Sequence, residues 1–148
     1  MNVLSVDSLS VRIGRRDIVQ GVSLTVEREQ TLGIVGESGS GKSTTVLAAT
    51  GLLDAPGAVV TGSSVLAGQQ ELVGAPARTL RRVHGGRIGF VFQDPGTSLN
   101  PLLTVERQIT ESLATHKNLT HRQARARALE LLEAVGLPDP QRRLRSYP

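Results

Sequence analysis

A glycine-rich loop at residues 36–43 sets the strongest limit on how this chain can fold. The segment reads GESGSGKS and matches the pattern G-x-x-x-x-G-K-[ST]. The apolar run 31–35 before the loop predicts a short buried strand, and residues 45–53 after it favour a helix. A loop between a strand and a helix is the context in which this pattern binds phosphate. The sequence therefore predicts an α/β fold, and a flexible Gly/Ser linker is not expected at this place.

Each residue type in the loop serves phosphate binding. Glycines such as Gly39 and Gly41 let the backbone curl until successive N–H groups point at one centre. A helix that begins near Gly41 adds the positive end of its dipole. The Lys42 ammonium can reach β- and γ-phosphates, and the Ser43 hydroxyl can bind Mg²⁺. We therefore predict a site for a nucleoside triphosphate with Mg²⁺, formed by Gly36, Glu37, Ser38, Gly39, Ser40, Gly41, Lys42, Ser43 and Thr44.

The composition argues against several other classes of protein. The chain of 148 residues has no cysteine, which excludes disulfides, thiolate nucleophiles and cysteine metal sites. No apolar run approaches the roughly 18 residues of a membrane span, and the N-terminus lacks the pattern of a secretory signal. The net charge is +4, but the arginines are dispersed and only three residues are aromatic. We expect a soluble cytosolic protein that does not bind nucleic acid, because base stacking needs more aromatic side chains.

Antiparallel strands are predicted ahead of the loop. Apolar residues alternate with mostly polar ones over residues 4–13 and again over 22–26. Residues 14–17, GRRD, are typical of a hairpin turn between such strands. Beyond the first helix, residues 57–87 indicate a strand or two, a loop and a short helix.

The remainder is predicted to be helical after one more strand at residues 87–92. A helix is expected over residues 105–115. A second helix begins after Thr120, where Gln123 completes a capping box. Its apolar residues fall on one face at spacings of three and four, and Gly136 ends it: Ala124, Ala128, Leu131, Leu132 and Val135.

Residues 88–101 distinguish among the proteins that share such a phosphate loop. They read IGFVFQDPGTSLNP, and this segment closely resembles the Q-loop of ATP-binding-cassette (ABC) transporter ATPases. The continuation QDPGTSLNPLLTVERQITE is similar to the branch that serves dipeptide, oligopeptide and nickel importers. The segments IVGESGSGKST and GVSLTV agree with the same branch, and the resemblance covers essentially the whole chain.

The resemblance implies roles for particular residues, with ATP as the nucleotide. In the family the Q-loop glutamine contacts Mg²⁺ and the attacking water. Gln93 is therefore expected to act with Lys42 in catalysis and with Ser43 in holding the metal, and a neutral amide can both coordinate and donate. An aromatic residue of the family stacks on adenine where this chain has Ile13, so we expect weaker base selectivity. Glu29 stands where the family often has glycine, and a positive φ there would be strained.

The resemblance also implies the architecture and the partners. We expect an α/β P-loop core of the ABC type with an N-terminal antiparallel β arm at residues 1–94, and a helical subdomain at 95–148, truncated at the C-terminus. The implied partners are transmembrane permease subunits, a second ATP-binding subunit and, indirectly, a periplasmic or extracellular solute-binding protein. The implied location is the cytoplasmic face of the cell membrane, and the implied solute is a peptide or nickel.

Several family motifs do not occur in these 148 residues. In relatives the tripeptide at 146–148, SYP, is followed by the LSGGQ-type signature, the Walker B aspartate, the catalytic glutamate and the switch histidine. The chain is therefore expected to be the first half of an ATP-binding domain, marginally folded and inactive in hydrolysis by itself. Two alternatives remain at this point: a nucleotide-binding regulatory module that never hydrolyses, and a different P-loop enzyme such as a small kinase.

Two further groups of residues have more than one interpretation. Phe90 and Phe92 alternate on the predicted strand, which favours a place in the core over contact with a ligand. Arg142, Arg143 and Arg145 favour a solvated helix end, although they could also face a partner or lipid.

Overall fold

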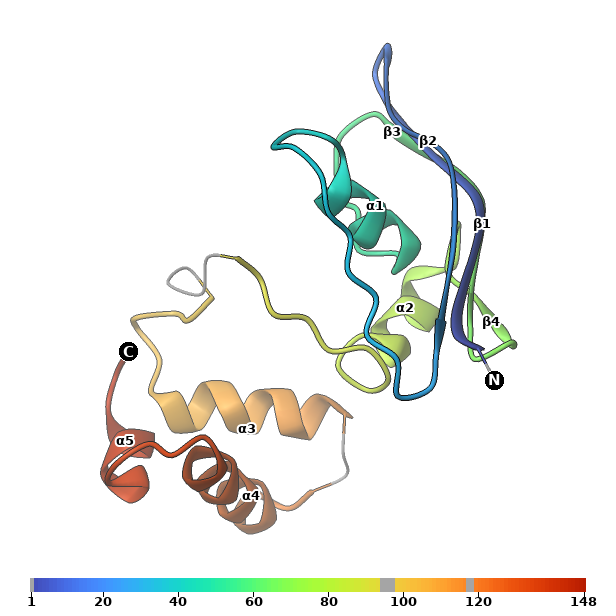
Figure 1. Ribbon diagram of the computed structural model, residues 1–148. Helices are drawn as coiled ribbons and strands as arrows, with labels where there is room; N and C mark the ends of the chain where they lie inside the picture. The colour runs from blue at the N-terminus through green and yellow to red at the C-terminus, as the bar shows by residue number, and fades with distance from the viewer. Residues whose placement is uncertain (1, 94–97, 117–118) are drawn as a thin grey trace. The chain divides into compact units, whose positions relative to one another are not determined.

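The computed structural model describes residues 2–93, 98–116 and 119–148 (Figure 1). The chain divides into two compact units, Met1–Arg81 and Arg82–Pro148. Each unit has its own elements and its own buried residues, so each is described by itself.

A four-stranded antiparallel sheet is the frame of the first unit. Its strands follow the order β2-β1-β3-β4, with bounds β1 Asn2–Ile13, β2 Arg16–Glu27, β3 Ala58–Leu66 and β4 Gln70–Glu71. A two-residue turn joins β1 to β2, and Ile13 pairs with Arg16 across it. The predicted hairpin is confirmed. Residues 57–87 also contain the predicted elements, which are two strands and the short helix α2 (Ala77–Val83).

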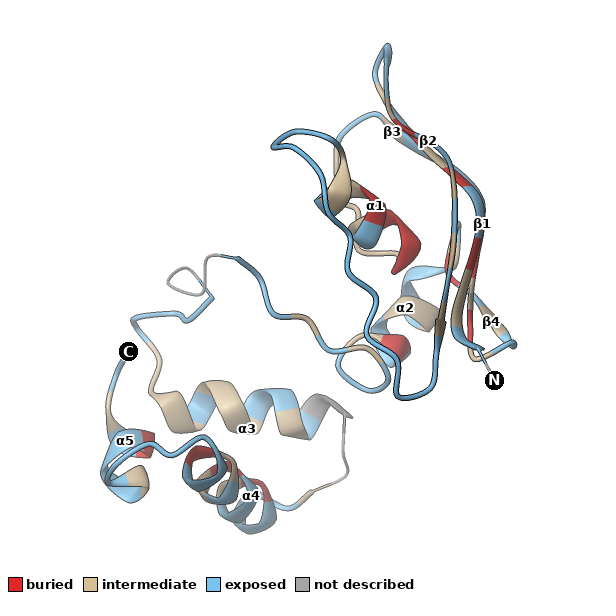
Figure 2. Ribbon diagram, viewed as in Figure 1, coloured by how far each residue is buried: buried red, intermediate tan, exposed pale blue. Residues whose placement is uncertain are grey.

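Helix α1 (Lys42–Ala49) packs against the sheet and closes the core of this unit. Alternation along β1 places Leu9 and Val11 on the face toward the helix, and both are fully buried. The helix contributes Ala48 and Ala49, whose small side chains permit close packing. Figure 2 shows in red the buried parts of β1 and of α1. The helix begins at Lys42, next to the Gly41 start expected for it, and ends at Ala49, before the predicted residue 53.

The Glu71 carboxylate fastens β4 to β3 and to the turn that follows. It accepts hydrogen bonds from the Ser63 hydroxyl and from the backbone N–H groups of Ser64, Leu72 and Val73, the last three at 2.8–3.0 Å. Burial raises the pKa of this carboxyl, but the four hydrogen bonds outweigh burial and lower the pKa below its ordinary value. Glu71 is therefore a structural carboxylate that stabilises this end of the sheet in its charged form.

The strand predicted over residues 31–35 is wrong for this structure. No strand among the described residues pairs with this segment, which runs without regular secondary structure between β2 and the phosphate loop. Its side chains are exposed, with Val35 at 92%. The prediction rested on apolar character, but a strand also needs a neighbour that takes its backbone hydrogen bonds. The described sheet offers this segment no such neighbour.

The strand predicted over residues 87–92 is also wrong, and for the same reason. The described residues of this segment make one isolated bridge, between His84 and Ile88. Phe90 and Phe92 stack with ring centroids 6.0 Å apart, and His84 meets Phe90 edge-on at 5.8 Å. Phe92 remains 56% exposed, so the pair is a local aromatic cluster and not a part of the core.

The described residues of the second unit form three helices of their own: α3 (Val105–His116), α4 (His121–Ala134) and α5 (Pro140–Arg145). Its core consists of Ala128 and Leu132 of α4 and Leu144 of α5. Leu144 is fully buried and packs α5 against α4. None of the described helices combines the length and the apolar character needed to cross a bilayer. The predicted boundary between residues 94 and 95 falls outside the described residues and stays a prediction.

The start of α4 agrees with the prediction. The N–H of Gln123 donates to the Thr120 hydroxyl and the Gln123 side chain accepts from the Thr120 N–H, which completes the capping box. The predicted apolar face is only partly correct, because Val135 at its end is 72% exposed. Val135 is the C-cap residue, where the chain leaves the helix and turns away from the packed face.

Candidate phosphate-binding site

The phosphate loop connects the unpaired segment after β2 to the N-terminus of α1. Gly39 and Gly41 adopt φ angles of +80° and +89°, which lie in the left-handed region that favours glycine. Between them the Ser40 N–H donates to the Glu37 carbonyl at 3.3 Å, which closes a tight turn. Residues 36–40 are exposed, so the curled backbone faces solvent and is open to a ligand.

Lys42 lies across the inside of this turn. Its ammonium donates to the carbonyl oxygens of Gly36 at 2.8 Å and Glu37 at 2.6 Å, and lies 3.4 Å from the Ser40 hydroxyl. An ammonium has three donors and carries its charge at a point, so it holds the loop closed and places a positive charge at its centre. A bound phosphate would meet this charge directly.

The N-terminus of α1 adds to the positive potential. Gly41 is the N-cap residue, and no side chain caps the helix. The first turn contains no acidic residue, so no carboxylate neutralises the positive end of the helix dipole. Ser43 is exposed in this turn, and among the described residues its hydroxyl has no hydrogen-bond partner. A free hydroxyl beside an anion site suits a hard cation such as Mg²⁺, which prefers oxygen ligands.

A close approach to β2 fixes the position of the loop on the sheet. A Cβ atom on Gly41 would lie 2.9 Å from the Ile18 carbonyl oxygen and 3.5 Å from a methyl group of Val19. Glycine is thus required at this position for space as well as for backbone conformation. The role of Ile18 was missed by the sequence analysis, because a backbone contact leaves no trace in the residue type.

The loop opens onto a cavity of about 550 Å³ between β2, residues 32–36 and the start of α1. Ser40, Lys42 and Thr45 line it on the loop side. The rest of the lining is mostly apolar and includes Val22, Leu24 and Ile34.

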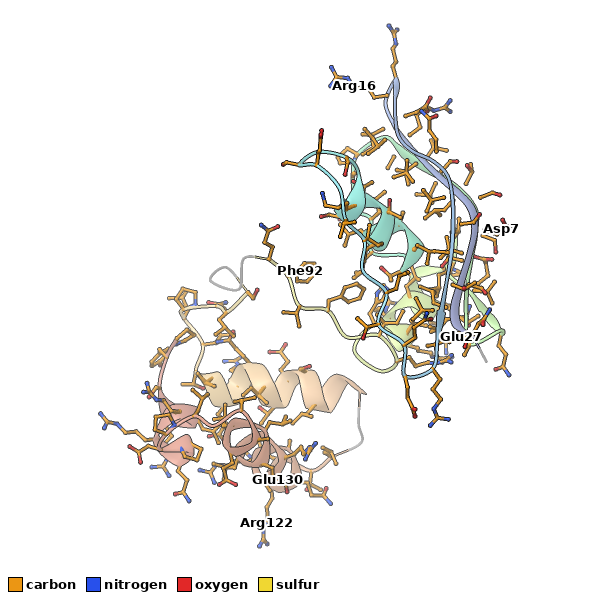
Figure 3. All side chains as sticks on the ribbon, in the orientation of Figure 1. Asp7, Arg16, Glu27, Phe92, Arg122 and Glu130 are labelled. Carbon is orange, nitrogen blue, oxygen red and sulfur yellow. The ribbon has the colours of Figure 1, made fainter. Side chains whose placement is uncertain are left out.

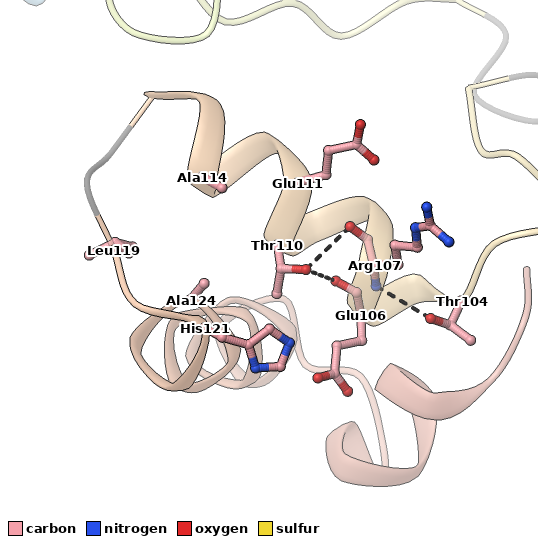
Figure 4. Close-up of a pocket in the computed structure, with 9 residues that line it drawn as sticks. All are labelled: Thr104, Glu106, Arg107, Thr110, Glu111, Ala114, Leu119, His121 and Ala124. Carbon is pink, nitrogen blue, oxygen red and sulfur yellow. Dashed lines mark hydrogen bonds between the residues drawn. The ribbon is translucent and has the colours of Figure 1, made fainter.

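A second cavity, of about 600 Å³, lies between α3 and α4 in the second unit (Figure 4). Its carboxylate Glu106 forms an ion pair with Arg125 at 3.2 Å. Its threonine Thr110 donates to the Glu106 carbonyl at 2.7 Å. None of the predicted phosphate-binding residues lines this cavity, so we do not regard it as the candidate site.

The structure brings all nine predicted loop residues, from Gly36 to Thr44, into one turn and the first turn of α1. Ile13 lies at the end of β1, half-buried against the core of the first unit. Gln93 belongs to the second unit and is exposed. The metal and water contacts of Gln93 and the adenine contact of Ile13 stay predictions. Glu29 does adopt the positive φ anticipated for its turn, at +63°.

A family model described as ABC transporter matches residues 19–148. The chain belongs to the ABC transporter family. It is 43% identical to the dipeptide transport ATP-binding protein DppD of Haemophilus influenzae, which it matches over its whole length and over 46% of that protein. It is 41% identical to the oligopeptide transport ATP-binding protein OppD of Bacillus subtilis, over 91% of this chain and 38% of OppD. The chain thus spans about half the length of the curated relatives it matches or less.

Solved ABC structures share the fold. The ATP-binding cassette MJ0796, in a dimeric post-hydrolysis state bound to ADP and Pi, aligns with a TM-score of 0.79 over 98% of this chain and 61% of that one. The cbiO1 protein of Clostridium perfringens aligns with a TM-score of 0.71 over 98% of this chain and 53% of that one. Their identities, 24% and 21%, support the fold alone. The α/β class and the ABC-type core with its antiparallel β arm are therefore confirmed.

Proposed function

We propose that this chain is the ATP-binding part of an ABC importer subunit that couples ATP binding and hydrolysis to the uptake of peptides. The observation that carries the proposal is the phosphate loop, with Lys42 at its centre and an uncapped helix end beside it. The names of the similar proteins, which are dipeptide and oligopeptide transport ATP-binding proteins, support a peptide as the solute. Nickel is the second solute class implied by the branch.

Each part of the loop has a role toward ATP. The loop N–H groups and the helix end would hold the β-phosphate, and Lys42 would neutralise the γ-phosphate. Ser43 would supply a hydroxyl ligand to Mg²⁺, and Gln93 an amide oxygen. Ile13 would give the adenine an apolar contact without ring stacking. A bound Mg²⁺ neutralises the charge that develops on the phosphates during transfer.

We infer that the 148-residue chain binds ATP and does not turn it over unaided. Hydrolysis requires a carboxylate that holds the metal and a group that orients the attacking water. The described loop supplies phosphate contacts, and Glu37, its acidic residue, contributes a backbone carbonyl to Lys42. In the working transporter we propose a second ATP-binding subunit and two transmembrane permease subunits as partners, at the cytoplasmic face of the membrane, with a solute-binding protein acting indirectly.

The test is nucleotide binding by Lys42→Ala, measured by calorimetric titration with ATP and Mg²⁺. Hydrogen bonds to charged groups contribute about 1.5–3 kcal/mol, so we expect the affinity to fall about tenfold or more. Lys117→Ala changes the only other lysine of the chain and is the control with the same change of charge. An unchanged affinity in Lys42→Ala would show that the site has been misassigned.

The solute is tested in cells that carry the gene. Uptake of a labelled dipeptide and uptake of nickel are measured in parallel, in the wild type and in a strain with Lys42→Ala. We expect dipeptide uptake to be lost and nickel uptake to be retained. Loss of nickel uptake alone would replace peptide by nickel in the proposal.

A further inference from the structure

The positive charge of the chain is carried by one of its two units. Residues 1–81 contain seven basic and seven acidic residues, whereas residues 82–148 contain ten lysines or arginines and six acidic residues. The net charge of +4 therefore belongs to the second unit. Within it, the six-residue helix α5 contains three arginines, in the sequence PQRRLR.

The packing of α5 directs these arginines to solvent. Leu144 is fully buried in the core of the second unit, whereas Arg142, Arg143 and Arg145 are exposed. At about 100° per residue the three arginines span about 160° of the helix, and the centre of that arc lies opposite Leu144. Because Leu144 packs into the core, all three arginines lie on the face of α5 that points to solvent.

These arginines have no acidic partner among the described residues. The arginines that do form ion pairs there are Arg28, Arg125 and Arg127. Cations in the last turn of a helix interact favourably with its dipole, but this accounts for a modest effect on stability and not for three outward-facing charges. The charge of α5 is therefore available to an external anion.

Exposed apolar residues flank the same helix. Val135 and Leu137, in the connection from α4, are 72% and 42% exposed, and Tyr147, just beyond α5, is 62% exposed. In the sequence, Leu137 precedes α5 by three residues and Tyr147 follows it by two. Arginines next to exposed aliphatic and tyrosine side chains are typical of a surface that lies at the boundary between lipid headgroups and acyl chains.

We propose that Arg142, Arg143 and Arg145, together with Val135 and Tyr147, form a surface that binds the anionic phosphate headgroups of a membrane; we call it the α5 surface. The planar guanidinium group matches a phosphate with paired hydrogen bonds. The choice of a membrane over another anionic partner rests on the proposed function, which places the chain beside membrane-embedded permeases. In that setting the α5 surface would strengthen membrane attachment independently of the permease.

The test is sedimentation of the full chain with vesicles of phosphatidylglycerol and phosphatidylcholine, compared with vesicles of phosphatidylcholine alone. A basic residue near an anionic surface contributes about fivefold to binding, so the triple variant R142Q/R143Q/R145Q is expected to lower partitioning about a hundredfold at low salt. The variant R142K/R143K/R145K keeps the charge but loses the paired guanidinium hydrogen bonds, so it is expected to bind less than the wild type and more than the glutamine variant. High salt is expected to release the wild type, because it screens the attraction.

The hairpin tip between β1 and β2 provides the matched control. R12Q/R15Q/R16Q also removes three exposed arginines without an ion-pair partner among the described residues, and Figure 3 shows Arg16 projecting from this tip. We expect this variant to bind vesicles nearly as the wild type does. If both triple variants lose vesicle binding equally, net charge alone explains the binding. If the wild type binds polyglutamate but not vesicles, the partner of the surface is an acidic protein. Either result overturns the proposal.

ATP titration of the same variants separates this proposal from the proposed function. R142Q/R143Q/R145Q is expected to keep the ATP affinity of the wild type and its helical circular dichroism. If the wild type binds anionic vesicles but not ATP, the proposed function fails and the α5 surface stands. If it binds ATP but not the vesicles, only the α5 surface is refuted.

Discussion

Two glycines of the phosphate loop allow conformation to be separated from space. Gly39 and Gly41 both have positive φ angles, at +80° and +89°. A Cβ atom on Gly39 would meet nothing within 4 Å, whereas one on Gly41 would lie 2.9 Å from the Ile18 carbonyl oxygen. We therefore compare Gly39→Ala with Gly41→Ala, which make the same chemical change in the same loop.

The two variants are expected to differ in stability by about 1–3 kcal/mol. A left-handed backbone costs an L-residue about 1–2 kcal/mol, and this applies to both positions. In both variants alanine also lowers the conformational entropy of the unfolded chain, which stabilises the folded state by about 0.4–1 kcal/mol. The free energy of unfolding of Gly39→Ala should therefore fall by about 1 kcal/mol in total. Gly41→Ala carries the additional cost of overpacking, about 1–3 kcal/mol, because the atom it meets belongs to the backbone of β2 and cannot rotate away.

Urea denaturation followed by far-ultraviolet circular dichroism measures this difference. The chain has no tryptophan, so fluorescence would report poorly on the first unit. Free energies of unfolding are compared only where the variants share the slope of the wild type, since a changed slope indicates a change of folded or unfolded state. Equal losses within about 0.5 kcal/mol would refute the steric argument and leave φ as the only constraint at Gly41.

Three other substitutions test separate features. Glu29→Gly is expected to raise the free energy of unfolding by about 1 kcal/mol, because Glu29 has φ +63° and its side chain is largely exposed. Glu29→Ala should leave this free energy unchanged, and thermal melts of the two variants measure the difference. The pKa of Glu71 is lowered in the folded protein, so its contribution to the free energy of unfolding is complete above pH 4.5, its ordinary pKa, and is lost as the pH falls through the lowered pKa. Thermal melts across that pH range should therefore show a smaller acid-induced loss of stability in Glu71→Gln than in the wild type. Ile13→Tyr is expected to increase the preference for ATP over GTP by about two- to tenfold in competitive titration, and no change would argue against an adenine contact at this position.

The features that sequence analysis predicted correctly depend on nearby residues. The start of α4 follows from Thr120 and Gln123, which are three residues apart, and the β1–β2 hairpin follows from a two-residue turn. The phosphate loop belongs to this group, because its pattern specifies a backbone path within eight residues. The start of α1 at Lys42 agrees with the helix expected to begin near Gly41, whereas its end at Ala49 falls before the predicted residue 53.

The two strand predictions that were wrong depend on distant residues. Residues 31–35 and 87–92 have the apolar character of buried strands, but each needs a neighbouring strand that the described residues do not provide. Apolar character indicates only that a segment gains from burial, and the pairing decides whether it becomes a strand. The contacts of Lys42 were also beyond sequence analysis, because they involve backbone carbonyls whose positions follow from the fold.

The phosphate loop has a defined shape although the segment before it, residues 31–35, is unpaired. Its shape must therefore depend on other contacts. Lys42 ties the first half of the loop to α1, and the close approach of Gly41 to Ile18 sets α1 on β2. Both restraints come from elements that are fully formed in the first unit, so the shape of the loop does not require residues 31–35 to join a sheet. On the proposed function, we therefore expect phosphate binding to depend on β2 and α1, whereas hydrolysis also needs a metal-holding carboxylate and an oriented water.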